Sequence, residues 1–242
     1  MKYLIFLCLV MTSHTALART FFGGGTFKSQ GNKDNVRWTL GDWLTQKKSF
    51  KAMDQWLALN RQANLFELNF EGSQSTYEID VMGTPTDFEV DRYSVQMWIS
   101  IFGLQYTWEE SDEDWEAESG QLNIRLFGQS TQTTNLTLHY GVRQVEYFNP
   151  ANEYNNQYGG VNLNLYIVSF FGLEGMYRKY LTAKDSNDVE VEGERSEYGA
   201  FIDVSFVRLY GNAFIDKTYR TTAGSTTMET REGVDAGVKF YF

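Results

Sequence analysis

The strictest constraint in this chain is the alternation of its last nine residues, 234–242. Apolar side chains occupy every second position, and polar or small residues stand between them. Because successive residues of a β-strand point to opposite faces, this spacing places the apolar side chains on one face. They are Val234, Ala236, Val238, Phe240 and Phe242. The sequence therefore predicts a strand that has one apolar face and closes on an aromatic residue.

The same period-two pattern recurs from residue 65 onward in about ten segments, which turn-rich stretches separate. One face of each segment is nearly all apolar, as in Leu136, Leu138, Tyr140 and Val142. A closed bacterial barrel with both ends of its sheet on the periplasmic side needs an even number of strands. We therefore expect residues 65–242 to form a closed antiparallel transmembrane β-barrel of about 10 strands, with roughly 8–12 allowed by segments of blurred alternation.

The opposite faces of these segments carry amides and charges of both signs. Their charged and histidine residues include Glu67, Glu71, Arg125, His139, Arg143, Glu174, Arg178, Asp203, Arg208, Asp235 and Lys239. In a membrane barrel these side chains face the lumen and the apolar face meets lipid. A soluble barrel has the same alternation with its apolar face inside, so periodicity alone does not separate the two. Tyrosines and tryptophans near the strand ends favour the membrane barrel, because such rings prefer the membrane interfaces.

The amino end has the features of a secretory signal peptide. Lys2 precedes the apolar run 3–11, which is too short to span a bilayer as a helix. Residues 16–18, Ala-Leu-Ala, fit the small-x-small cleavage pattern, so we expect residues 1–18 to be removed after Ala18. The only cysteine, Cys8, lies inside this signal, which leaves the mature chain without a disulfide or a thiolate metal site.

An exported chain whose final strand ends on Phe242 resembles the Gram-negative outer-membrane β-barrel proteins. The resemblance is to the superfamily, and no specific family is assigned. It implies residence in the bacterial outer membrane, contact with outer-membrane lipids and lipopolysaccharide, and recognition of the final strand by the barrel assembly machinery. Nucleic acid is not an expected partner, because the chain has a formal net charge of −10 and loses Lys2 with the signal.

Residues 38–60 break the alternation. Their apolar residues recur at three- and four-residue steps, which is typical of an amphipathic helix. These residues are Leu40, Trp43, Leu44, Phe50, Met53, Trp56 and Leu57. The helix follows a flexible linker at 19–37 and is expected on the periplasmic side. Three roles stay open for it: plugging the barrel from below, lying on the inner leaflet, or docking a periplasmic protein.

A barrel of this size is far narrower than the porins that hold an open water channel. An interlocking salt-bridge network in the lumen is therefore expected, with a selective permeation path as the alternative. His139 is the only histidine of the mature chain, and it matches neither the omptin protease nor the lipid A deacylase site. We expect it to be hydrogen-bonded within the lumen, with no catalytic, cofactor or metal site in the chain.

The longer polar connectors 81–89, 110–118, 149–157, 183–195 and 221–231 are expected as external loops, and both prolines fall in them. Residues 109–118 hold seven carboxylates and are expected to form a solvated acidic loop. Divalent cations beside lipopolysaccharide phosphates are the alternative, although the ligand spacing of an EF-hand is absent. Tight periplasmic turns are expected near Ser100, Ser169, Ser205 and 128–134.

These patterns predict a non-enzymatic outer-membrane barrel with a narrow or plugged lumen and a structural or surface-interaction role in the cell envelope. Three alternatives remain: a small-solute channel, an outer-membrane enzyme acting on lipid or peptide, and a soluble exported barrel that binds an apolar ligand.

Overall fold

The computed structural model describes residues 64–81, 84–148, 151–222 and 225–242. The predicted signal (1–18), linker (19–37) and amphipathic helix (38–60) lie outside the described residues. The strands are β1 (Phe66–Val81), β2 (Thr84–Ile99), β3 (Phe102–Ser111), β4 (Trp115–Phe127), β5 (Asn135–Phe148), β6 (Ala151–Val168), β7 (Phe171–Lys184), β8 (Glu190–Val204), β9 (Val207–Thr222) and β10 (Ser225–Tyr241). No helix in the described part of the chain is long and apolar enough to cross a membrane.

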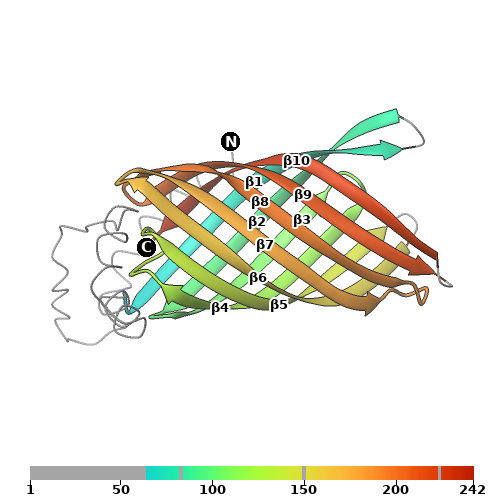
Figure 1. Ribbon diagram of the computed structural model, residues 1–242, viewed down its shortest axis with the longest axis horizontal. Coiled ribbons are helices and arrows are strands. Elements are labelled where there is room, and N and C mark those ends of the chain that lie inside the picture. The colour runs from blue at the N-terminus through green and yellow to red at the C-terminus, as the bar shows by residue number, and fades with distance from the viewer. Residues whose placement is uncertain (1–63, 82–83, 149–150, 223–224) are drawn as a thin grey trace, which may run out of the picture. The chain divides into compact units, whose positions relative to one another are not determined.

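Each strand pairs antiparallel with its neighbours in the sequence, and β1 pairs with β10 to close the barrel (Figure 1). The closing register sets Asn69 opposite Tyr241 and Glu78 opposite Glu232. The predicted closed antiparallel barrel of ten strands is therefore confirmed. Closure leaves no open sheet edge along the shared length of these two strands, as a spanning sheet requires.

The apolar face predicted for each segment lies on the outer surface of the barrel. On β5, Leu138, Tyr140 and Val142 are 43%, 52% and 57% exposed, whereas Thr137 and His139 are buried in the interior. This arrangement has the polarity of a membrane barrel and the opposite polarity to a soluble one.

We call the end of the barrel that carries Phe66 and Phe242 the near rim. Its turns are short, as predicted: residues 100–101, 169–170 and 205–206 each connect two strands, and 128–134 makes the fourth connection. Ser100 and Ser205 adopt φ values of 58° and 57°. Short polar side chains tolerate this left-handed region better than β-branched ones.

The opposite end, the far rim, differs from the prediction of long loops. β1 and β2 are separated by residues 82–83 alone, and β3 and β4 by residues 112–114. Most of each predicted loop belongs to a strand, and Pro85 lies in β2 opposite Asp80. The prediction failed because it looked for apolar outer faces. In these extensions the alternation continues with the polarity reversed.

The reversal divides the barrel into two parts. In the near half, next to the near rim, the outer surface is apolar and the interior is polar. In the far half, the interior holds an apolar cluster that we call the far core. It comprises Tyr77, Val90, Trp115, Ala117, Val145, Tyr154, Val191 and Phe214. Exposed aromatic side chains stand on the outer surface near the transition, as membrane interfaces favour: Tyr93, Trp108, Tyr140, Tyr177 and Tyr198.

Candidate functional site

The turn between β4 and β5 reaches across the near rim. Thr131 enters the barrel, and its amide and hydroxyl donate to Glu67 Oε2 at 2.8 and 2.7 Å. Gln132 Nε2 donates to the carbonyl oxygen of Ser205 at 2.8 Å, in the turn between β8 and β9. Because these two turns belong to strands far apart around the barrel, residues 128–134 form a strap across its mouth.

Two arginines anchor the interior behind this strap. Arg125 is fully buried, pairs with Glu67 at 3.0 Å and stacks over the Trp98 ring at 4.4 Å. Arg208 Nε pairs with Asp203 at 2.8 Å, and its Nη2 donates to the Tyr166 hydroxyl at 2.7 Å. A charge-assisted pair shielded from water is held tightly, because an unpaired partner would remain buried.

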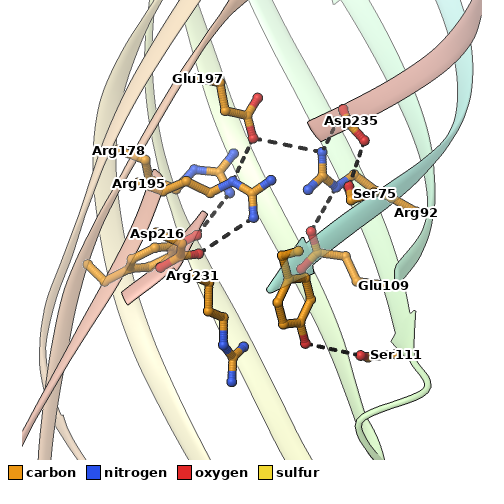
Figure 2. Close-up of polar contacts among 12 residues, drawn as sticks. Ser75, Arg92, Glu109, Ser111, Arg178, Arg195, Glu197, Asp216, Arg231 and Asp235 are labelled. Atoms are coloured by element: carbon orange, nitrogen blue, oxygen red, sulfur yellow. Dashed lines mark hydrogen bonds and ion pairs between the residues drawn. The ribbon is translucent and has the colours of Figure 1, made fainter. Parts of the chain in front are cut away.

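A central ion network crosses the lumen at the transition between the two halves (Figure 2). Arg92 is its hub and pairs with Glu109 at 2.8 Å, Asp235 at 3.5 Å and Glu197 at 3.9 Å. The network also includes Arg143, which pairs with Glu109 at 2.8 Å, and Arg195, which pairs with Glu197 at 2.6 Å and Asp216 at 3.5 Å. These side chains come from β2, β3, β5, β8, β9 and β10, so the network ties opposite walls together.

The far core lies between this network and the far rim. Val145 and Val191 are 1% exposed and Phe214 is 3% exposed. The guanidinium of Arg195 lies 4.2 Å from the Phe214 ring, which joins the network to the core. These packed apolar side chains fill much of the interior of the far half, as in the interior of a soluble protein.

A polar cavity lies in the near half of the interior, between the strap and the central network. Its volume is about 140 Å³, and its lining is mainly amides, hydroxyls and charges. A second cavity of about 30 Å³ lies among the network and far-core residues. A polar cavity of the larger size has room for several hydrogen-bonded waters.

The structure places the predicted lumen residues on the inner wall. Ion pairs join Glu67 to Arg125, Glu71 to Lys239, Asp203 to Arg208, Glu174 to Arg208, Arg143 to Glu109 and Asp235 to Arg92. Two residues differ from the rest. No ion pair joins Arg178 to a described carboxylate, and no described group hydrogen-bonds to His139 Nε2. His139 instead presents its ring to Tyr158, with the ring centroids 6.1 Å apart.

Sequence reasoning missed charged residues of the interior that include Arg92, Arg195, Glu197 and Arg231. All four lie at or beyond the transition, in or next to the segments that the sequence pattern predicts as external loops. The signal was present, because Arg92 has the same strand parity as Gln96, and Arg195 and Glu197 have the parity of Asp203. Extending each alternating segment toward the far rim places all four on the inner wall.

The acidic stretch 109–118 is a hairpin and not a solvated loop. Glu109 faces the lumen, and Glu113 folds over the far core. There Glu113 Oε2 accepts hydrogen bonds from the Tyr77 hydroxyl and from Trp115 Nε1, and pairs with Arg231 at 3.1 Å. Within the described residues, no group of three or more His, Cys, Asp or Glu side chains is placed to hold a metal ion.

An acidic row crosses the outer surface of the far half. In register, Asp91 stands opposite Glu110, Glu110 opposite Glu116, Glu116 opposite Glu146, and Glu146 opposite Glu153. Directly opposed like charges on neighbouring strands repel each other. The acidic row therefore weakens the sheet that carries it and gives this face a strong negative charge.

At the far rim, Asp185 organises the turn between β7 and β8. Its Oδ1 accepts the amides of Asn187 at 2.8 Å and Val189 at 2.9 Å, and its Oδ2 accepts Asn152 Nδ2 at 2.9 Å. Burial raises the pKa of Asp185, but these hydrogen bonds to the carboxylate outweigh it and hold the pKa below its ordinary value.

The five alternating apolar residues of the last strand lie on the outer surface, and Phe242 is 56% exposed at the near rim. The Phe242 ring lies 5.9 Å from the Phe70 ring and 6.3 Å from the Phe206 ring. Its amide donates to the Leu68 carbonyl at 2.8 Å, so the terminal residue still takes part in the closing seam.

No protein-family model matches the chain, and no curated protein does. Solved structures with a similar fold include the translocator domain of autotransporter NalP from Neisseria meningitidis, at 10% identity and a TM-score of 0.39, covering 82% of this chain and 95% of that one. Neisserial surface protein A matches at 12% identity and a TM-score of 0.32, covering 74% of this chain and 98% of that one. The β domain of the Bordetella autotransporter BrkA matches at 11% identity and a TM-score of 0.33, covering 73% and 99%.

These neighbours are Gram-negative outer-membrane β-barrels. At such TM-scores the likeness carries no argument about activity. The architecture of this chain follows from its own strand pairing.

Proposed function

We propose that the protein is an outer-membrane β-barrel with a closed lumen, whose far half projects from the membrane as a rigid surface element. The far core is the observation that carries this proposal. β6 has 18 residues, whereas a tilted strand crosses a bilayer with about 9–11. The remaining length carries polar side chains outside and apolar side chains inside, which suits a part of the barrel that stands in water.

Three seals support a non-conducting lumen: the strap at 128–134, the central ion network and the far core. Small solutes would have to displace all three to cross. We therefore assign the protein a structural or surface-interaction role in the cell envelope, in which the exposed far half and its acidic row are the surface offered to the outside.

Conductance in planar bilayers tests this proposal. We expect the refolded full chain to give no current steps at any applied voltage, with folding verified by heat-modifiable gel mobility. A chain lacking residues 19–60 serves as the comparison, and silence in both supports intrinsic closure. Reproducible single-channel currents from the full chain would overturn the closed barrel.

A narrow channel for small solutes is the second candidate, and the polar cavity of the near half favours it. This reading requires the far core to open. The variant Trp115→Ser with Phe214→Ala widens the far half, and Trp108→Ser on the outer surface is its control. Currents in the native protein that grow only in the far-core variant would establish the channel.

We propose no enzymatic role. A histidine base needs a nucleophile within hydrogen-bond reach and an orienting acid. No described group bonds to His139 Nε2, which leaves no described nucleophile in that position. An activity on lipid or peptide that His139→Ala abolishes in a folded barrel would contradict this assignment.

Residence in the outer membrane, with lipids and lipopolysaccharide around the apolar surface of the near half, completes the proposal. Separation of outer-membrane vesicles from periplasmic contents tests it, and recovery in the soluble periplasmic fraction would refute it. The predicted cleavage after Ala18 is checked by the mass of the mature chain recovered from the outer-membrane vesicles. A periplasmic partner for residues 38–60 stays a proposal, tested by crosslinking from Trp43 or Trp56.

The assembly role of the last strand is also a proposal. Phe242 contacts only a few neighbours, so its deletion should have a small effect on refolding into detergent. In cells, loss of recognition by the assembly machinery should cut the folded yield far more. Equal yields of the native and deleted chains in cells would contradict a recognition role for Phe242.

A further inference from the structure

One inclined row of inward-facing positions runs around the near half from β2 to β7. In register, Trp98 stands opposite Gly103, Gly103 opposite Asn123, and Asn123 opposite His139. The row continues from His139 to Gly160 and from Gly160 to Arg178. Side chains at directly opposed positions lie about 5 Å apart at Cβ, so the row forms one continuous stretch of wall.

The two glycines of this row make room for two rings. A Cβ at Gly103 would lie 2.7 Å from the Trp98 ring, and a Cβ at Gly160 would lie 2.4 Å from His139 Nε2. The Trp98 and His139 rings therefore lie over bare backbone, against the wall. Both side chains line the 140 Å³ cavity, as do Asn123 and Arg178.

All four of these side chains present an unpartnered nitrogen. Trp98 Nε1, Asn123 Nδ2, His139 Nε2 and Arg178 Nε have no hydrogen-bond partner among the described residues. Trp98 and Asn123 are 2% exposed and His139 is 6% exposed. Burying such groups without partners costs free energy, so a ligand or water that satisfies them is favoured.

Arg178 adds a charge without a paired counter-ion. Its guanidinium lies 4.5 Å from the Tyr158 ring and donates to the Tyr180 hydroxyl at 3.4 Å. Glu197 pairs with Arg195 at 2.6 Å and with Arg92 at 3.9 Å, and no ion pair joins it to Arg178. Arg92, by contrast, has three carboxylates within 4 Å.

The carboxylates that line this cavity are engaged by basic residues. They are Glu71, Glu109, Glu174, Glu197 and Asp235, on β1, β3, β7, β8 and β10. Each has a basic residue within ion-pair distance. The β4, β5 and β6 lining contains no carboxylate among the described residues, and Asn212 Oδ1 is the one acceptor atom of the described lining that is fully buried without a partner.

We propose that this cavity binds a small anion, held by Arg178 and Asn123 with Trp98 completing the donor set. Among the buried unpartnered groups of the lining, hydrogen-bond donors outnumber acceptors, and one of the donors is a full cation. This balance favours an anion over a neutral polyol. The cavity volume limits the occupant to a halide or a small carboxylate such as formate, with accompanying water. Binding here is independent of whether the barrel conducts.

Thermal unfolding of the full chain, refolded separately in sodium chloride, formate or gluconate at equal ionic strength, tests the proposal. Gluconate is too large for the cavity and serves as the ionic-strength control. We expect the native protein to unfold at a higher temperature in chloride or formate. Arg178→Met should lose the whole anion-dependent shift, whereas Lys217→Met, on the outer surface, should keep it.

A second variant keeps the test decisive if Arg178→Met fails to fold. Asn123→Asp places a carboxylate among the same donors and should make the unfolding temperature insensitive to the added anion. Crystals grown in bromide should show an anomalous peak between Asn123 and Arg178. Equal unfolding temperatures in all three salts, or an anion shift that persists in both variants, would leave water as the occupant and overturn the proposal.

Discussion

In the near half of the barrel, β5 sets Leu138 and Val142 on its outer face and encloses His139. Farther along the same strand, Glu146 is on the outer face and Val145 is enclosed, with 1% of its surface exposed. One strand therefore passes from a polar interior to an apolar one without changing its geometry. The proposed placement, with lipid around the near half and water around the far half, accounts for the difference, because lipid selects an apolar outer surface, whereas water selects an apolar interior.

The comparison also explains where the polar chemistry of the molecule lies. Apolar side chains fill only part of the interior of the near half, around Tyr166, Phe201 and Tyr210, because most inward positions there are polar. Its charges must find one another across the lumen, and the ion pairs around Arg92, Arg125 and Arg208 do so. The row around Arg178 is where this pairing is incomplete.

The largest effect is expected in the far core. Phe214→Ala should lower the free energy of unfolding by about 3–5 kcal/mol, because it removes a ring from a packed interior. Phe148 is 53% exposed on the outer surface of the far half, and Phe148→Ala should change stability by about 0.5 kcal/mol or less. Urea unfolding of barrels refolded in lipid vesicles measures both. Similar losses would mean that the far half is not a filled core.

The next effect tests the outer surface. Leu138→Arg should cost about 2–4 kcal/mol, because it puts a charge against lipid near the midplane. Gln144→Arg, three outward positions nearer the far rim on the same strand, should cost little, because Gln144 stands beyond the apolar surface. The same vesicle titration measures both variants. Tolerance of arginine at Leu138 would place the membrane elsewhere on the barrel.

A smaller effect is expected at the far rim. Asp185→Asn should weaken the β7–β8 turn by about 1 kcal/mol, since amide hydrogen bonds to a charged group are stronger than those to a neutral one. The folded pKa of Asp185 is below that of the unfolded chain. Its contribution is therefore present above the ordinary aspartate pKa of about 3.9 and is lost as the pH falls through the lower folded pKa.

Hydrogen exchange at the Asn187 and Val189 amides measures this contribution, and the gap between native protein and variant should close on acidification. Asp188→Asn is the matched control, because the Asp188 side chain in the same turn is 89% exposed. A gap that is unchanged at acid pH would show that the charge of Asp185 does not hold the turn.

The smallest expected effect is a gain in stability, whereas the preceding variants lose stability. Glu116→Gln should stabilise the barrel by about 0.2–1 kcal/mol at low salt, because it removes repulsion from Glu110 and Glu146. Glu194→Gln, opposite Lys217, should be neutral or slightly destabilising. Added salt should shrink both effects. Stabilisation by both variants alike would point to net charge as the cause, with no specific role for the acidic row.

Strand identity and facing could be predicted because both are local. The alternation around Leu138, Leu163 and Leu209 placed these side chains on the outer surface without any knowledge of the partner strands. The far half was mistaken for loops because its alternation, in residues such as Trp115 and Glu116, has the polarity of a soluble sheet. Only the neighbouring strands show that it continues the same barrel.

The sequence by itself determined which residues share a face, since side-chain direction in a strand follows from the backbone of that strand alone. It could not determine that Thr131 meets Glu67, that Arg92 meets Asp235, or that Arg178 has no ion pair within the described part of the barrel. Those outcomes depend on closure and register, which join residues 64 positions apart in the first pair and 143 positions apart in the second. The tertiary structure alone decided them, because the barrel brings its walls together only when the last strand pairs with the first.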